Sequence, residues 1–195
     1  MSNQGTGTLE RLAAVSLERC LLKISGTSGG GWRLAGISVA SGTLAEAVNR
    51  HEFKAASAAA VYIHVQSGLP FTSVMLFDPD DIPHIAKCFV GDSLAGAGAI
   101  AQFGEVMLLE LGNIVLNAVI NYLQNVLKKS AIPSVPMFLS GDPSHISGGL
   151  GVYMDPRQFF RIVSAEINVS GGGCVSRGAV VIILPEELAA ALELP

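Results

Sequence analysis

The longest uninterrupted hydrophobic pattern in the chain covers residues 103–129. Because this stretch contains no proline and only two glycines, it predicts a single long helix. Its apolar side chains cover most of the helix circumference at about 100° per residue, which is typical of a buried helix. A narrow polar stripe interrupts them, since residues three and four positions apart lie on one face. This polar stripe consists of Glu110, Asn113, Asn117, Asn121, Gln124 and Lys128.

The polar stripe argues against a membrane-spanning helix. Residues 106–127 are long enough to cross a bilayer, but they carry Glu110 and several carboxamides, which are costly in lipid. Asparagine is also a poor helix former, so a row of it on one face needs contact with solvent, with a partner or with internal polar groups. We therefore predict a buried helix in a protein without a membrane partner.

The first half of the chain contains three predicted helices and three predicted strands, and its longest helix comes first. That first helix covers residues 9–24, with Thr8 as its N-cap and Ser25-Gly26 at its end. Residues 1–8 are expected to be disordered. The remaining elements are strands at 32–40, 60–66 and 71–77, a short helix at 43–51, and a helix at 78–89 opened by Asp78-Pro79.

The strand at 60–66 alternates between apolar and polar residues. Alternation with a period of two predicts a strand with one buried face and one exposed face. The predicted inward residues are Val61, Ile63 and Val65, and the predicted outward residues are Tyr62, His64 and Gln66.

The second half of the chain repeats the order of the first. After a small-residue linker at 91–98 and the long helix, strands are predicted at 135–139, 159–169 and 175–184, separated by a turn-rich stretch at 140–157 and followed by a helix opened by Pro185. Residues 74–89 and 180–194 each read as a strand followed by a helix that proline starts. The chain therefore resembles a duplication.

This order predicts an α+β fold in a single domain, residues 9–195, made of two repeats at about 9–91 and 103–195. The two long helices should lie together over an antiparallel or mixed sheet. A pseudo-two-fold axis should relate the repeats, as in a homodimer fused into one chain.

Composition narrows the class of protein. Half of the residues are hydrophobic and 14% are charged, which predicts a large core, and the net charge of −4 gives no electrostatic footprint for nucleic acid. The first eight residues lack the pattern of a signal peptide, so we expect a cytoplasmic protein. Cys20, Cys88 and Cys174 are far apart, which favours buried reduced thiols over a disulfide or zinc site.

No metal or phosphate motif is found in the sequence. His51, His64, His84 and His145 lack the spacing of metal ligands, and the glycine-rich segment 26–31 is not followed by the GK[ST] of a P-loop. The sequence therefore predicts neither a metal nor a cofactor of its own.

Residues 110–113 carry the most specific motif in the chain. Glu110-Leu111-Gly112-Asn113, followed by 22 residues and Pro136, resembles the signature of the CheC/CheX/FliY family. That signature is an Asp or Ser, three residues, Glu, two residues, Asn, 22 residues and Pro. The duplicated layout also resembles CheC over nearly the whole chain.

Two features depart from this signature. Val106 stands at the Asp or Ser position, and the first half has no Glu-x-x-Asn. Ser16, Cys20 and Lys23 are taken as the first-half counterparts of the signature residues. We therefore infer one candidate site where CheC has two.

The resemblance implies a phosphatase of phosphorylated response regulators such as phospho-CheY in two-component signalling. An aspartyl phosphate is a reactive acyl phosphate, so its hydrolysis mainly needs a water held in line with the phosphorus. A carboxamide both donates and accepts hydrogen bonds at fixed angles, which fits Asn113 for orienting that water. Glu110 would contact a basic group on the regulator, thought in this family to be its active-site lysine. The regulator would supply Mg²⁺.

A second hypothesis is a docking or scaffold module of the same fold with weak or no hydrolysis. It would bind a regulator, a CheD-like protein or a switch component. Val106 and the missing first site favour this hypothesis, whereas the Glu110–Asn113 pair favours the enzyme. A third hypothesis is a structural dimer whose interface is the polar stripe.

Each motif residue also has a simpler interpretation. An exposed Glu is commonly just solvated, helical asparagines such as Asn117 and Asn121 can pair with a neighbouring helix, and Pro136 can shape the start of a strand. The joint spacing selects Glu110 and Asn113 as catalytic candidates. It leaves Asn117 as part of the polar face only.

Overall fold

The computed structural model describes residues 7–54, 56–68, 70–91 and 97–194, and the side chains of all of these except 97–103. Its strands are β1 Gly31–Gly42, β2 Ala58–Ser67, β3 Phe71–Phe77, β4 Ile132–Pro133, β5 Met137–Gly141, β6 Phe160–Gly171 and β7 Cys174–Pro185. Its helices are α1 Thr8–Thr27, α2 Leu44–Asn49, α3 Ile82–Val90 after a 3-10 turn at Pro79–Asp81, α4 Ala97–Leu127, α5 Pro143–Leu150 and α6 Glu186–Glu193.

The strands form one seven-stranded antiparallel sheet with pseudo-two-fold order. The order is β1-β6-β7-β3-β2, and β4 and β5 both pair with β2. If β1 is matched with β5, β2 with β6 and β3 with β7, the order reads the same from either edge, with the axis between β3 and β7. The predicted α+β fold with internal symmetry is confirmed, whereas the repeat boundaries remain a prediction.

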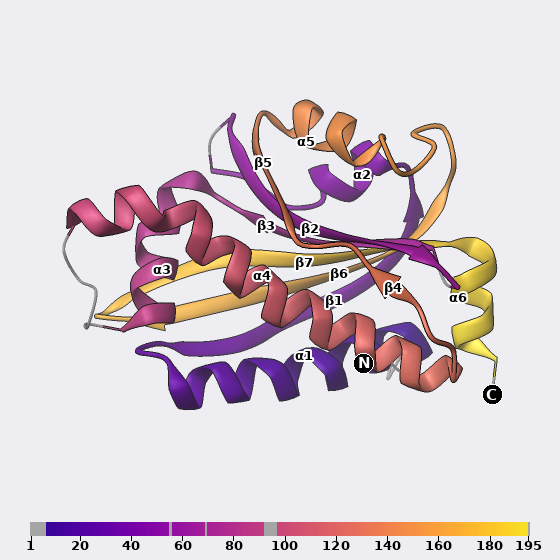
Figure 1. Cartoon of the computed structure of the whole chain (residues 1–195), viewed down its shortest axis with the longest axis horizontal. Helices are drawn as coiled ribbons and strands as arrows, with labels where there is room; N and C mark the ends of the chain where they lie inside the picture. Colours follow the sequence, from indigo (N-terminus) through magenta and orange to yellow (C-terminus); the bar gives the residue numbers. More distant parts are fainter. Residues whose placement is uncertain (1–6, 55, 69, 92–96, 195) are drawn as a thin grey trace, which may run out of the picture.

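Helices cover both faces of the sheet. The long helices α1 and α4 lie side by side across one face, with α3 and α6 beside them (Figure 1). The adjacency of the two long helices was predicted and is confirmed. The shorter helices α2 and α5 pack together on the opposite face.

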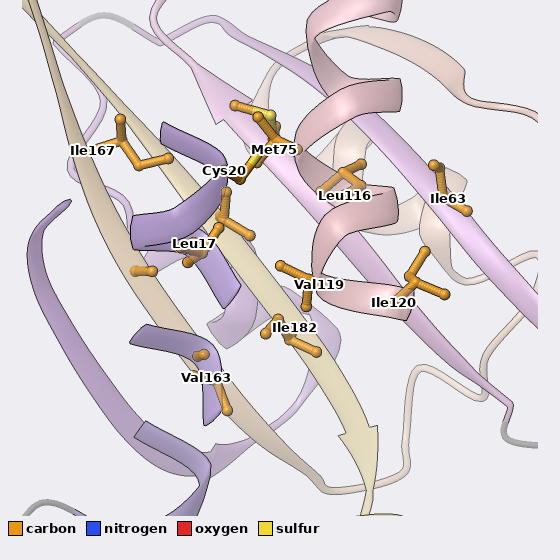
Figure 2. Close-up of a cluster of buried hydrophobic side chains, with 14 of the residues drawn as sticks. Leu17, Cys20, Ile63, Met75, Leu116, Val119, Ile120, Val163, Ile167 and Ile182 are labelled. Carbon is orange, nitrogen blue, oxygen red and sulfur yellow. The ribbon is translucent and has the colours of Figure 1, made fainter. Parts of the chain in front are cut away.

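The main core lies between the long helices and the sheet. Figure 2 shows Leu17 and Cys20 of α1 next to Leu116 and Val119 of α4. Burying a large aliphatic side chain contributes roughly 1.5–3 kcal/mol, so this layer dominates the stability of the fold. The strand residues labelled with them are Ile63, Met75, Val163, Ile167 and Ile182.

Helix α4 touches strand β2 directly at Gly112. A Cβ atom placed on Gly112 would lie 2.4 Å from Val61 Cγ1 and 2.9 Å from Val61 Cβ. Such distances are far shorter than a van der Waals contact. Only glycine therefore allows the helix backbone to approach the strand this closely.

Strand β2 is buried on both faces, which corrects the predicted exposure of Tyr62 and His64. Both side chains lie under the α5 segment, where Tyr153 stacks on His64 with ring centroids 4.9 Å apart. The Nδ1 atom of His64 lies 2.9 Å from Thr72 Oγ1. Gln66 is exposed, as predicted.

Helix α5 was not predicted, and it and the turn after it, which carries Tyr153, cover this face of β2. It occupies Pro143–Leu150 inside the stretch interpreted as turns. Asp142 caps the helix by accepting a hydrogen bond from His145 N at 2.8 Å. The serines and glycines of this segment favour turns, so tertiary packing of Ile146 and Leu150 determines the helix instead.

Several boundaries also differ from the prediction. Helix α1 begins at Thr8, so its N-cap is Gly7, whose N–H donates to Glu10 Oε2 at 2.9 Å. Helix α4 begins at Ala97, inside the predicted linker 91–98, of which 92–96 lie outside the described residues. Residues 1–6 of the predicted disordered segment also lie outside the described residues.

All three cysteines are free thiols, but only two are buried. Cys20 and Cys88 lie in the core, as predicted, whereas Cys174 is exposed at the start of β7. The prediction of a buried thiol was therefore wrong for Cys174, which stands beside the turn between β6 and β7.

The contact between Gly112 and Val61 predicts an unusual response to alanine. Gly112→Ala should lower the free energy of unfolding by about 1–3 kcal/mol, because overpacking outweighs the gain in helix propensity. The matched control is Gly104→Ala in the same helix, where the new Cβ would lie 3.6 Å from Ile82 Cγ2, an ordinary contact. That control should gain up to about 1 kcal/mol.

Urea unfolding of both variants and the parent measures the two changes. Equal stability of Gly112→Ala and Gly104→Ala would show that the helix can move away from β2 at no cost.

Candidate functional site

The polar stripe of α4 lies on the side of the helix that faces away from the sheet. Glu110 is exposed and Asn113, one turn later, is half-buried. Val106 precedes them on the same side with 61% of its surface exposed, and Ile114 follows with 39%. The candidate residues therefore form one continuous, partly apolar surface on a rigid helix.

Asn117 holds the side chain of Asn113 in place. Its Nδ2 atom donates to Asn113 Oδ1 at 2.8 Å and to the Asn113 backbone carbonyl at 2.9 Å. These bonds use one lone pair of Oδ1 and leave the other lone pair and the NH₂ group of Asn113 for other partners. Sequence reasoning assigned Asn117 only to the polar face, although carboxamides four residues apart on a helix commonly bond to each other.

The later part of the stripe has a different role. Gln124 Nε2 donates to the Ala131 carbonyl oxygen at 3.1 Å, which ties the end of α4 to the chain that enters β4. Asn121, between the two, is exposed. The row of carboxamides thus divides into an ordered pair, an exposed residue and a structural contact.

Pro136 lies outside the helix, one residue before β5. It is half-buried, and the adjacent Met137 pairs with Tyr62 of β2. Just before it, Ser134 is bonded to the backbone of His64 through both its N–H and its Oγ, at 2.8 and 3.1 Å. The structure therefore shows Pro136 at the edge of the sheet that α4 covers, where it starts a strand.

The first-half counterparts of the motif differ from the ones inferred from sequence. Every buried position of α1 has a buried counterpart in α4 that lies 99 residues later in the chain. The pairs are Leu9 and Leu108, Leu12 and Leu111, Ala13 and Gly112, Ser16 and Val115, Leu17 and Leu116, Cys20 and Val119, Leu21 and Ile120, and Ile24 and Leu123. The same offset places Arg11 opposite Glu110 and Ala14 opposite Asn113.

Ser16 and Cys20 are therefore core residues and cannot be equivalents of surface motif residues. Ser16 Oγ donates to the Ala13 carbonyl oxygen at 2.9 Å, and Cys20 Sγ lies 3.8 Å from the Ile114 carbonyl oxygen of α4. Burial raises the pKa of the Cys20 thiol, an effect that the charge of Lys23 partly offsets. Arg11 and Ala14 carry neither the carboxylate nor the carboxamide of the motif.

Helix α4 also contains a segment, Gly104–Leu127, that is long and apolar enough to cross a membrane. Its apolar side packs against the sheet and α1, whereas its outward side carries Glu110 and the asparagines. This distribution is that of the central helix of a globular core.

Comparison with known proteins identifies the architecture. No family model and no curated protein matches the sequence. FliY from Thermotoga maritima superposes with a TM-score of 0.70 at 13% identity, over 98% of this chain and 95% of that chain. This is the CheC/CheX/FliY fold.

Two further structures share the CheC/CheX/FliY fold. A chain of the FliM–SpeE complex from H. pylori has a TM-score of 0.59 at 14% identity, over 98% of this chain and 96% of that one. CheX from Desulfovibrio desulfuricans has a TM-score of 0.53 at 10% identity, over 90% and 97%. The predicted resemblance is confirmed at the level of the fold, and the roles of Glu110 and Asn113 remain predictions.

The correspondence between α1 and α4 can be tested with a glutamate at each of the two residues of α1 that were matched to Glu110. The sequence suggested Cys20, and the structure indicates Arg11. Cys20→Glu should lower the free energy of unfolding by about 3–5 kcal/mol, because it would bury an unpaired carboxylate. Arg11→Glu should change it by less than about 0.5 kcal/mol, since the side chain is exposed near the start of the helix. Chemical denaturation measures both, and similar losses would contradict the assigned register.

Proposed function

We propose that this protein hydrolyses the aspartyl phosphate of a response regulator such as phospho-CheY. The observation that carries the proposal is the pair Glu110 and Asn113, one turn apart on the outward side of α4, with Asn113 held by Asn117. The CheC/CheX/FliY fold, shared with a protein named as CheX, supports it.

Asn113 would orient the attacking water. An acyl phosphate has a good leaving group, so positioning of the nucleophile contributes more than strong base catalysis. Because Asn117 already bonds to Oδ1, the carboxamide plane of Asn113 is restricted before any partner arrives. Its free lone pair can accept a hydrogen bond from the water, and its NH₂ group can donate one to a phosphoryl oxygen.

Glu110 would bind the regulator rather than take part in the chemistry. Its carboxylate is exposed one turn before Asn113 and can accept a charge-assisted hydrogen bond from a cationic group. The regulator would bring the phosphoryl group and Mg²⁺, so the chain would need no cofactor of its own. Such a partner implies a cytoplasmic protein.

A docking module is the second candidate function. The fold is shared with a chain of the FliM–SpeE complex, which is an assembly between two proteins. The exposed Val106 and Ile114 beside the motif also suit an apolar contact with a partner surface. In this alternative, the regulator, a CheD-like protein or a switch component would bind without rapid hydrolysis.

Asn113→Ala tests the enzyme hypothesis. It should slow decay of the regulator's aspartyl phosphate by about 10²-fold or more, the scale observed when one positioning or stabilising group is lost. Regulator affinity should change much less, because the interaction exists mainly in the transition state. Decay of phosphorus-labelled regulator with and without the variant gives the rate.

Asn121→Ala is the matched control, since this exposed asparagine lies on the same stripe beyond the ordered pair. It should retain parental activity. If Asn113→Ala hydrolyses the acyl phosphate as fast as Asn121→Ala, the enzyme hypothesis fails and docking takes its place.

Glu110→Ala should have a different signature. Its partner is a charge present before the reaction, so affinity for the regulator should fall together with the rate. Binding titration against a phosphorylated regulator mimic, followed at two salt concentrations, separates this effect from catalysis. An affinity equal to that of the parent would remove Glu110 from the proposed interface.

Val106→Asp tests the departure from the family signature. If an acidic residue supports the site, this change should raise the hydrolysis rate, and folding should be little affected because the side chain is 61% exposed. Val106→Asn serves as the control, because asparagine has about the same size as aspartate but no charge. An unchanged rate in both variants would show that the position does not contribute.

A further inference from the structure

A cavity of about 350 Å³ lies at the end of the molecule opposite the C-terminus of α4, away from the polar stripe. It is formed where the end of α3 meets the turn between β6 and β7 (Figure 1). Both Cys88 and Cys174 line it, together with His84. Two thiols and an imidazole thus share one opening, although they come from distant parts of the sequence.

Strand register brings the two cysteines close together. Gly171 and Cys174 face each other across the β6–β7 turn, so their side-chain directions point to the same side of the sheet. A Cβ atom on Gly171 would lie 2.7 Å from Cys88 Sγ. Directly opposed Cβ atoms are about 4.5–5.5 Å apart, so the Cys174 side chain starts on the residue next to the one that touches the Cys88 sulfur. Besides the larger effect of burial, the two thiols are also close enough for Cys174 to raise the pKa of Cys88.

Glycines clear the space around Cys88. A Cβ atom on Gly30 would lie 2.6 Å from Cys88 Cβ, so the glycine-rich segment after α1 packs directly on this residue. Gly172 and Gly173 form the turn with φ values of 56° and 81°, which favour glycine at both positions. The turn therefore reaches Cys174 without a side chain at either of its two central positions.

His84 is oriented toward the buried thiol. Its Nε2 lies 3.0 Å from the Gly171 carbonyl oxygen, which can only accept, so Nε2 carries the proton. Nδ1 then accepts from Ser176 Oγ at 2.8 Å. The same Nε2 atom lies 3.5 Å from Cys88 Sγ, so its N–H group can be shared with a thiolate there.

The two thiols differ in access. Cys174 is exposed, whereas Cys88 is only 4% exposed. Burial raises the pKa of the Cys88 thiol, and the charge of Lys87 partly offsets this. A small oxidant from solution would therefore reach the Cys174 thiol first. It could reach the Cys88 thiol only after entering the cavity.

We propose that Cys174 and Cys88 are the reactive and resolving thiols of a reversible disulfide formed by a peroxide. The Cys174 thiolate attacks one peroxide oxygen, the O–O bond breaks, and the departing hydroxide takes a proton to form water. The Cys88 thiolate then attacks the sulfur of the Cys174 sulfenic acid, the S–O bond breaks, and a second water leaves. The two thiols lose two electrons in total, and a dithiol reductant restores them.

Hydrogen peroxide treatment of the full chain, followed by unfolding, alkylation and peptide mapping, tests this assignment. Free thiols should fall from the three of the sequence to one, with Cys88 and Cys174 in one cross-linked peptide and Cys20 alkylated. The intact mass should fall by two hydrogen atoms and return after dithiol treatment. A map in which Cys174 is joined only to another chain, or oxidised without Cys88, would overturn the proposal.

Single variants test the order of the two steps. In Cys88→Ala, the sulfenic acid on Cys174 should persist and be captured by a 1,3-diketone reagent, whereas Cys174→Ala should leave Cys88 reduced. His84→Gln should lengthen the life of the sulfenic acid without removing the disulfide. Cys20→Ala is the control and should form the disulfide like the parent. Equal diketone capture in Cys88→Ala and the parent would contradict the resolving role, and the map of the parent remains decisive if a variant does not fold.

Discussion

The contact of Gly112 with Val61 determines how α4 sits on the sheet and therefore which of its residues reach the surface. Gly112 points at β2, and a helix turns about 100° per residue. Asn113 is then about 100° from the contact and lies at the boundary of the buried face, while Glu110 is about 200° away and lies on the far side. Their observed exposures follow: half-buried for the carboxamide residue, exposed for the carboxylate residue. A glycine that is needed for packing thus sets the geometry of the candidate site.

The two halves of the chain keep this packing and differ in surface chemistry. Ala13 stands at the position of Gly112 and is also buried, so a small residue lets each long helix approach its strands. Every other core position of α1 has its counterpart in α4 as well. On the outward side the match ends, because Arg11 and Ala14 replace Glu110 and Asn113. Packing constrains one side of the helix, and the other side is free to carry or lose a reactive group.

Sequence patterns predicted most of the fold, because periodicity reports burial. The long helices, the paired strands and the duplication all follow from apolar spacing. Helix α5 was missed, since its serines and glycines favour turns until Ile146 and Leu150 pack beneath it. That omission also made Tyr62 and His64 look exposed. The counterparts of the motif in α1 were misplaced because residue types were compared with the family signature. The correct comparison matches the buried positions of α1 with those of α4.

The candidate site itself was only partly predictable. The spacing of Glu110 and Asn113 indicated a shared face, but the hydrogen bonds from Asn117 depend on side-chain orientation. Those bonds matter physically because a free carboxamide would lose rotational entropy when it positioned a water. A neighbour four residues on restricts it in advance, because residues at that spacing lie on one face of the helix. The chemistry of the proposed site thus rests on a local property of the helix, whereas the location of the site rests on the sheet beneath it. A second site on α1 would accordingly require new groups at Arg11 and Ala14, both outside the core, so the number of motif copies is decided by surface residues and not by the stability of the fold.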